Sequence, residues 1–175
     1  MTKKWVFRKL CPDETVPSKA KTVKKTYMLP NGLVDEFYVD QDRSSVCIFA
    51  LTNTQGVVVV KQFRPHTERE EVELPGGGVG KGEGLMEAAA RELREETGFT
   101  GQMIHLASNF YSPSSSGKRH LFMAVECERT QEFLDLDPNE FVRVRVVPLT
   151  AFRKMMRHGM VRGYEAAYLG LDLLG

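Results

Sequence analysis

The sequence has 175 residues, 42% of them hydrophobic and 27% charged, a balance that is ordinary for a globular protein with a buried core. Its 24 basic and 23 acidic residues leave a formal net charge of +1, so bulk charge gives no reason to expect binding to nucleic acid or to a membrane surface. No apolar run approaches the roughly 18 residues of a membrane span, and no apolar segment follows the basic N-terminus as it would in a signal peptide.

The three cysteines are far apart in the chain and form no Cys-x-x-Cys motif. Cys47 and Cys127 lie in apolar runs, where a free cysteine usually serves as a small core residue. An odd number of cysteines used in this way is typical of a reducing compartment. We therefore expect the protein to work in the cytoplasm.

The first third of the chain is predicted to form strands. Residues 22–40 contain two β-prone runs on either side of Asn31-Gly32, the strongest short signal for a hairpin turn. A second strand–turn–strand pattern joins 45–51 to the valine run after Gly56, and unbroken valines predict burial on both faces. The polar residues 40–43 mark the expected boundary between an N-terminal hairpin segment, 1–42, and a main domain, 43–175.

Helices are expected singly, after strands or between them. A glycine-rich loop, 76–84, leads into a helix predicted from 85 to 97, with Gly98 as its left-handed stop. Strands are expected around 103–111, 120–126 and 141–147. Further helices are expected over 148–158 and 162–173. Because a regular βαβ alternation is missing, the pattern predicts an α+β fold.

The helix over 85–97 carries an unusual acidic cluster. On a helical wheel, Glu92, Glu95 and Glu96 fall in one sector, where like charges repel by a few tenths of a kcal/mol per pair. A solvated acidic face is one interpretation. A site for a hard divalent cation is the other, because Mg²⁺ prefers carboxylate oxygens and Glu83 lies at the start of the same helix. The adjoining core stripe is expected to contain Met86, Ala89, Ala90, Leu93 and Thr97.

The spacing of these residues resembles a known motif. From Gly77 the sequence reads G-x5-E-x7-R-E-L-R-E-E-T-G-F, similar to the Nudix box, G-x5-E-x7-R-E-U-x-E-E-x-G-U, in which U is bulky and apolar. Every specified position matches. The resemblance implies a metal-dependent hydrolase of a nucleoside diphosphate linked to another group. It also implies an α/β/α sandwich around a mixed β-sheet.

The resemblance assigns roles within the box. Arg91 would orient the glutamates by ion pairing rather than touch the substrate, and Glu95 or Glu96 would take part in activating the attacking water. Bound Mg²⁺ or Mn²⁺ would neutralise the diphosphate and offset the repulsion between the glutamates. The positions implied to hold or support the metal are Glu92, Glu95, Glu96, Glu83 and Gly77.

Outside the box, the runs LPNGLVDEFYV, VCIFALTNTQGVVVVKQFRP and EVELPGGG are similar to the ADP-ribose and nucleoside-diphosphate-sugar pyrophosphatase branch. Pro113, fifteen residues after Gly98, also fits that branch. The implied reaction splits a nucleoside diphosphate sugar, ADP-ribose foremost, into a nucleoside monophosphate and a sugar phosphate. Members are typically homodimers whose N-terminal hairpins exchange and help to build the partner's substrate pocket, which here would involve residues 1–42.

The same resemblance suggests substrate contacts. Arg64 matches an arginine that commonly contacts the ligand, although an arginine in a surface ion pair is the alternative. Glu73 lies where an acid often helps to hold metal or substrate. Tyr27, with Phe37 and Tyr38, is expected either to stack on the base or to pack in the core or a dimer interface.

One departure concerns the loop SPSSSGKRH, where the branch often carries a glutamate acting as general base and this chain has no acid. Either Glu95, Glu96 or an acid elsewhere would then deprotonate the water. Lys118, Arg119 and His120 would contact phosphate or the sugar, or simply form a solvated loop tip. Two alternatives remain: a hydrolase of another diphosphate (GDP-mannose, a dinucleotide or a nucleoside triphosphate), or a non-catalytic module that binds nucleotide sugars.

Overall fold

The computed structural model describes residues 22–41, 43–131, 134–136 and 141–175. Cys11 and the start of the expected N-terminal segment, 1–21, lie outside these residues. The strands are β1 (Thr22–Met28), β2 (Val34–Asp40), β3 (Ser45–Thr52), β4 (Gly56–Arg64), β5 (Arg69–Glu73), β6 (Phe99–Phe110), β7 (Lys118–Arg129), β8 (Val142–Pro148) and β9 (Val161–Arg162). The helices are α1 (Leu85–Thr97), α2 (Leu149–Arg157) and α3 (Tyr164–Leu173). No helix in the described part of the chain is long and apolar enough to cross a membrane.

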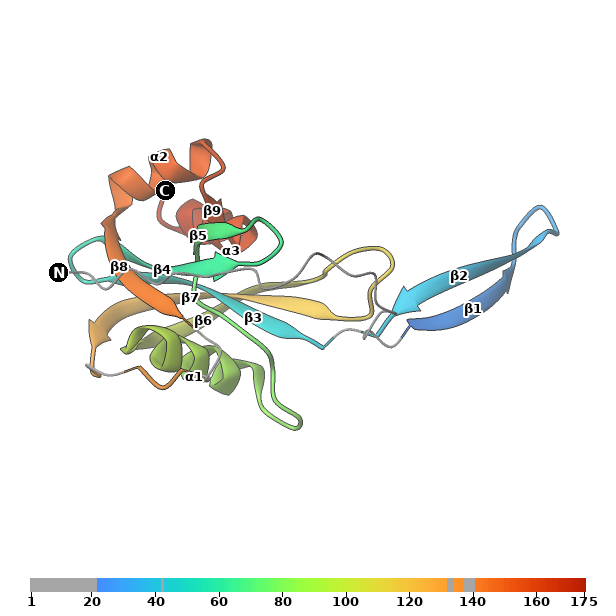
Figure 1. Ribbon diagram of the computed structural model, residues 1–175, viewed down its shortest axis with the longest axis horizontal. Coiled ribbons are helices and arrows are strands. Elements are labelled where there is room, and N and C mark those ends of the chain that lie inside the picture. Colours follow the sequence, from blue (N-terminus) through green and yellow to red (C-terminus); the bar gives the residue numbers. More distant parts are fainter. Residues whose placement is uncertain (1–21, 42, 132–133, 137–140) are drawn as a thin grey trace.

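Strands β1 and β2 form a separate two-stranded hairpin that projects from the rest of the molecule (Figure 1). At its base Asp40 forms a single parallel bridge with Ser115. The turn at Asn31-Gly32 is confirmed, with Gly32 in the left-handed region. The other strands form one mixed sheet in the order β6-β7-β3-β4-β5-β9, with β8 paired to β4. Within it β3 runs parallel to β7 and β5 parallel to β9, whereas the remaining pairs are antiparallel.

Helices cover both faces of this sheet, with α1 on one side and α2 and α3 on the other (Figure 1). The alternation of side chains along β3 explains the two cores. Ile48 packs in the core under α1 with Ala89 and Leu93, whereas Phe49 packs in the core under α2 and α3, against Phe152. The valine run of β4 is buried throughout, as predicted. The expected α/β/α sandwich around a mixed sheet is confirmed.

The buried side of α1 differs from the predicted stripe. Met86 and Ala90 are exposed, whereas Ala88 is fully buried. The helix is rotated so that its buried side includes Glu96, whose carboxylate accepts a hydrogen bond from the backbone N–H of Gly76 at 2.9 Å. Packing of the small Ala88 against the sheet therefore brings the carboxylate sector to the edge of the core.

The predicted start of the last helix was two residues early. Val161 and Arg162 form β9 beside β5, because the N–H of Leu74 donates to the carbonyl of Arg162 at 3.1 Å. Gly163 then takes a left-handed conformation, with φ of 82°, before α3 begins. This short strand places Arg162 beside Glu73 at the end of β5.

Gly170 allows α3 to lie directly on the sheet. A Cβ atom added there would lie 2.3 Å from Cδ1 of Phe49, a ring that is fully buried. On helix propensity alone, Gly170→Ala would stabilise the protein by about 1 kcal/mol. We expect it instead to lower the free energy of unfolding by about 1–3 kcal/mol, because the added methyl overpacks the core. Urea denaturation would measure this, with the exposed Tyr168→Ala as a control within about 0.5 kcal/mol of wild type.

Candidate active site

The loop between β5 and α1 lies against the start of β3. Val46 donates its N–H to the carbonyl of Gly77 at 2.9 Å, and Ile48 donates to that of Pro75 at 2.9 Å. A Cβ atom on Gly76 would lie 2.3 Å from the carbonyl oxygen of Val46, so only glycine fits there. This close approach aims the N–H of Gly76 at the Glu96 carboxylate.

The neighbouring glycine makes room for a second carboxylate. A Cβ atom on Gly77 would lie 2.6 Å from the carboxylate of Glu92. Gly77 and Glu92 were predicted to belong to one site, and the structure brings them together. The backbone of the glycine loop and the acidic face of α1 are therefore in direct contact at two consecutive residues.

Arg91 lies among the remaining acidic side chains. Its Nε donates to Glu83 at 2.7 Å, and its Nη1 donates to Glu92 at 2.9 Å and to Glu95 at 2.8 Å. Nη2 reaches Glu83 again at 3.1 Å and the carbonyl of Gly78 at 3.0 Å. One guanidinium group thus joins the loop to three glutamates of the box.

This network shifts the ionisation of its members. Hydrogen bonds from Arg91 and from the N–H of Gly80 lower the pKa of Glu83 from its ordinary 4.5 to about 2. The hydrogen bond to Glu83 in turn raises the pKa of Arg91 above its usual value. Both groups therefore stay charged at neutral pH.

The donor set of the box fits a hard divalent cation. Glu92, Glu95 and Glu96 offer only carboxylate oxygens, which Mg²⁺ and Mn²⁺ prefer, and the backbone of Gly77 lies directly against the Glu92 carboxylate. Among the described residues, no three acidic, histidine or cysteine side chains already converge on one point. In this conformation Glu92 and Glu95 turn instead to Arg91, and Glu96 turns to Gly76.

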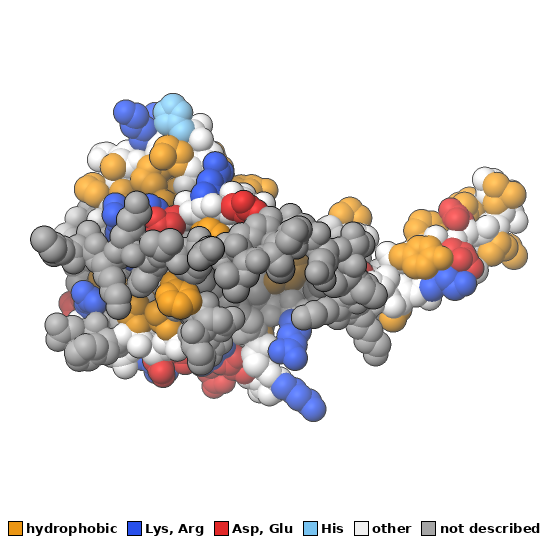
Figure 2. Space-filling model, viewed as in Figure 1, with side chains coloured by type: hydrophobic (Ala, Val, Ile, Leu, Met, Phe, Trp, Pro, Cys, Tyr) orange, Lys and Arg blue, Asp and Glu red, His pale blue; other side chains and the backbone are white. Residues whose placement is uncertain are grey.

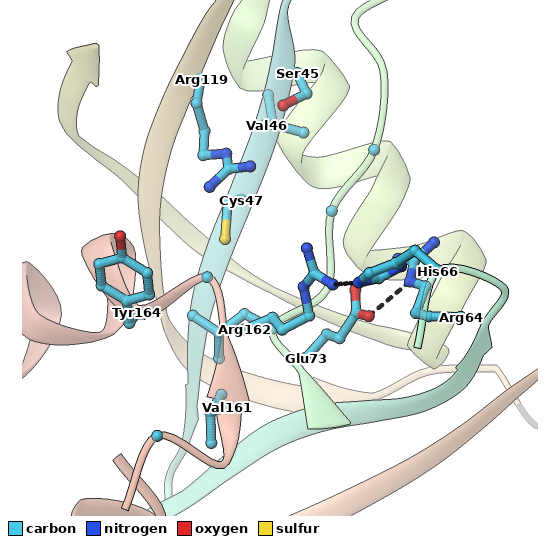
Figure 3. A pocket seen from close by; sticks show the side chains of 15 residues that line it. Ser45, Val46, Cys47, Arg64, His66, Glu73, Arg119, Val161, Arg162 and Tyr164 are labelled. Atoms are coloured by element: carbon cyan, nitrogen blue, oxygen red, sulfur yellow. Dashed lines mark hydrogen bonds and ion pairs between the residues drawn. The ribbon is translucent and has the colours of Figure 1, made fainter. Parts of the chain in front are cut away.

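A cavity of about 580 Å³ opens on the other side of Gly76 and Gly77 (Figure 3). Arg64 and Glu73 lie in its wall and form a bidentate pair, with Nε–Oε1 and Nη2–Oε2 distances of 2.6 and 2.5 Å. The pair raises the pKa of Arg64 above its usual value. Two of the predicted substrate residues, Arg64 and Glu73, are thus brought together beside the box.

The other two predicted substrate residues lie elsewhere in this chain. Tyr27 is on the projecting hairpin, where its ring packs edge-on against Phe37 with centroids 5.8 Å apart. Pro113 lines a separate hollow near the base of the hairpin, beside Val39 and Phe110. Neither residue lines the cavity beside Gly76.

Several residues of this cavity were not predicted from the sequence. His66 was assigned no role, and Arg162, Cys47 and Tyr164 were not considered as site residues, yet all four line the cavity (Figure 3). They come from separate elements, so no local motif connects them. Burial raises the pKa of the Cys47 thiol to about 12, which keeps it protonated.

The basic loop residues have different environments. Arg119 lines the cavity and forms an ion pair with Glu165 at 3.2 Å. Lys118 lies over the ring of Phe110, 5.1 Å from its centroid. His120 is buried and shares a 2.7 Å hydrogen bond with the hydroxyl of Ser108, and burial lowers its pKa. Of the three, Arg119 alone lines this cavity.

Comparison with known proteins agrees with this geometry. The model of the NUDIX domain matches residues 41–167. An ADP-ribose pyrophosphatase of Bacillus subtilis is 36% identical over 142 residues, which cover 80% of this chain and 77% of the relative. A methanol dehydrogenase activator of Bacillus methanolicus is 36% identical, with 65% and 63% covered, and an ADP-ribose pyrophosphatase of Saccharomyces cerevisiae is 32% identical, with 62% and 50% covered.

The fold is also similar to a known structure. The crystal structure of an ADP compounds hydrolase superposes with a TM-score of 0.78 at 23% sequence identity, covering 91% of this chain and 89% of the other. This likeness concerns the fold, whereas the domain match covers the box, the cavity and the sheet between them. The chain therefore belongs to the Nudix family, as a hydrolase related to the ADP-ribose pyrophosphatases.

Proposed function

We propose that this protein hydrolyses a nucleoside diphosphate sugar, ADP-ribose foremost, to a nucleoside monophosphate and a sugar phosphate. The observation that carries the proposal is the shared wall of the two sites. Gly76 and Gly77 contact the carboxylates of Glu96 and Glu92 on one side and line the cavity on the other. A diphosphate at this wall would reach both the box and the cavity. The similarity to ADP-ribose pyrophosphatases supports this choice of substrate.

In this proposal Glu92, Glu95 and Glu96 hold the metal, Mg²⁺ or Mn²⁺, and Glu83 and Gly77 support the site. Nudix hydrolases generally use divalent ions, which when bound neutralise the diphosphate and lower the pKa of an attacking water. Glu95 and Glu96 are the acids of the described chain that we propose to accept the proton of that water. Glu95 is half-buried and Glu96 is buried.

Arg64 is proposed to bind the diphosphate. Its Nε and Nη2 are held by Glu73, which leaves the two N–H groups of Nη1 without a partner among the described residues. Glu73 acts as a positioning residue, because two hydrogen bonds fix the plane of the guanidinium group. An arginine fixed in this way loses little further side-chain entropy when a phosphate oxygen binds.

The test is a substrate screen in Mg²⁺ and, separately, in Mn²⁺. ADP-ribose, ADP-glucose, GDP-mannose, UDP-glucose, a dinucleotide and GTP would each be incubated with the protein, and the products resolved by ion-exchange chromatography. We expect ADP-ribose to give AMP, and Glu96→Gln to lower kcat by about a hundredfold or more. Glu87→Gln is the matched control, since glutamine can still accept the N–H of Gly84 at the start of α1. Binding of ADP-ribose without cleavage would refute the proposal.

Arg91 is proposed to orient the glutamates. The pKa of Glu83 can be used to measure its contact with Arg91. Because the pKa of Glu83 is depressed by folding, its contribution to stability is present above about pH 4.5 and is lost as pH falls through about 2. In Arg91→Ala we expect the pKa of Glu83 to rise towards 4.5, measured by ¹³C NMR of its carboxyl group. The difference in the free energy of unfolding between Arg91→Ala and wild type should shrink as the pH falls from about 4.5 to about 2. Arg94→Ala, which removes an arginine 4.0 Å from Glu95, should leave Glu83 unchanged.

We also propose that the protein is a homodimer that exchanges its N-terminal hairpins. An isolated two-stranded hairpin is marginally stable in water, and this one exposes large apolar side chains (Figure 2). These side chains are 45–77% exposed: Tyr27, Met28, Leu33, Val34, Phe37 and Tyr38. A second copy would cover them and would place Tyr27 of the partner subunit nearer the cavity. The division into 1–42 and 43–175 remains a prediction of this proposal.

Sedimentation equilibrium would test the dimer. We expect wild type to sediment as two chains, and Tyr27→Ser combined with Phe37→Ser to sediment as one, because the apolar face of the hairpin is lost. Lys24→Ser is the control, since it removes only an exposed ion pair with Glu36 on the same hairpin. A wild type that is monomeric at micromolar concentration would contradict hairpin exchange.

We further infer a cytoplasmic location. Cys47 and Cys127 are both buried as free thiols in the two halves of the core. Unpaired core cysteines of this kind are typical of proteins in reducing compartments.

A further inference from the structure

Three arginines line the cavity beside the box, and each is held by a carboxylate through one edge only. Arg64 uses Nε and Nη2 for Glu73, whereas Arg119 uses Nη1 for Glu165 and Arg162 uses Nη1 for Glu71. Arg162 also contacts His66, and the Arg119 guanidinium lies over the ring of Tyr111, 5.2 Å from its centroid. The other N–H groups of Arg119 and Arg162 make no hydrogen bond within the described chain. Fixed guanidinium groups with unused donors are suited to a ligand that is rich in acceptor oxygens.

The Arg162 side chain has a second hydrogen-bond partner, His66, besides Glu71. Its Nη1 donates to Nε2 of His66 at 2.6 Å as well as to Glu71 at 3.0 Å. Because arginine only donates, His66 is the acceptor of this hydrogen bond, at Nε2. The guanidinium group of Arg162 is thus oriented by two elements, the turn after β4 and the strand β5.

Each guanidinium group of the cavity wall is paired with a carboxylate, although of the three carboxylates only Glu73 lines the cavity itself. Arginine donors beside carboxylate acceptors suit an uncharged group that both accepts and donates, which is the chemistry of sugar hydroxyls.

We propose that Arg162 and Arg119 determine specificity by binding the uncharged sugar of the substrate, the arm that lies beyond the diphosphate. This inference rests on the proposed function. Figure 3 shows Arg119 and Tyr164 on one side of the cavity and Arg162 with Arg64 and Glu73 on the other. A sugar between the two groups would be contacted from both sides. Tyr164 is exposed at this wall and offers an aromatic face to the C–H groups of the ring.

The test separates the two arms of the substrate. For wild type, Arg162→Met and Arg119→Met, kcat/KM would be measured with ADP-ribose and ADP-glucose, which differ in the sugar, and with ADP-glucose and UDP-glucose, which differ in the base. We expect each variant to change the ADP-ribose to ADP-glucose ratio by about tenfold, the effect of losing a charge-assisted hydrogen bond. The ADP-glucose to UDP-glucose ratio should stay within about twofold of wild type.

Product inhibition gives an independent readout. The inhibition constant of ribose 5-phosphate should rise in both variants, whereas that of AMP should not. Arg143→Met is the matched control, because Arg143 pairs with Glu70 at 3.0 Å and does not line the cavity. Thermal melting of each variant would confirm that it folds. If Arg162→Met does not fold, Arg162→Lys would replace it, because lysine keeps the charge but not the planar fork.

The outcomes distinguish the two proposals. Suppose that wild type cleaves ADP-ribose, but the variants leave the ADP-ribose to ADP-glucose ratio of kcat/KM unchanged or change the ADP-glucose to UDP-glucose ratio instead. Either result would overturn the assignment of Arg162 and Arg119 and would leave the proposed activity intact. A wild type that cleaves none of the sugar nucleotides would refute the proposed function itself.

Discussion

The acidic face of α1 depends on one guanidinium group. Glu92 and Glu95 lie one turn or less apart and would repel each other at neutral pH. Arg91 contacts both, and it also holds Glu83 and the carbonyl of Gly78 in the preceding loop. With this arginine in place Glu83, Glu92 and Glu95 are held around one guanidinium group. The loop is tied to the helix by the same contacts, so the two parts of the box are kept together.

The position of the box follows from packing in the core. Ala88, Ala89 and Leu93 are fully buried against the sheet, which fixes the rotation of α1 about its axis. That rotation buries Glu96 far enough for its carboxylate to meet the N–H of Gly76. Gly76 in turn lies against β3 so closely that no side chain fits. The acidic face of α1 and the cavity beside Gly76 are therefore placed by the same few contacts between small residues.

Local patterns predicted much of this from the sequence. The hairpin turn at Asn31-Gly32 and the helix that ends at Gly98 depend on residues adjacent in the chain, and both were located correctly. The spacing of the box is likewise local, because a loop and one helix contain all of it. The buried side of α1 was misplaced, since the position of Ala88 depends on the sheet it meets and not on periodicity alone.

The cavity could not be predicted in the same way. Arg162, His66 and Arg119 are brought together by the pairing of β9 with β5 and of β7 with β3, which no short-range signal specifies. A two-residue strand such as β9 is also too short to show a periodic pattern. Arg64 and Glu73 were predicted as site residues only because they lie in segments that resemble a known branch.

The buried thiol of Cys47 in the cavity wall bears on how the protein resists oxidation. Burial raises the pKa of this thiol far above neutral pH, so the thiolate form is scarce. Peroxides and electrophiles attack the thiolate, so Cys47 is a poor target for them although it lines the cavity. The pocket thus gains a small apolar wall residue without becoming a target of oxidative inactivation.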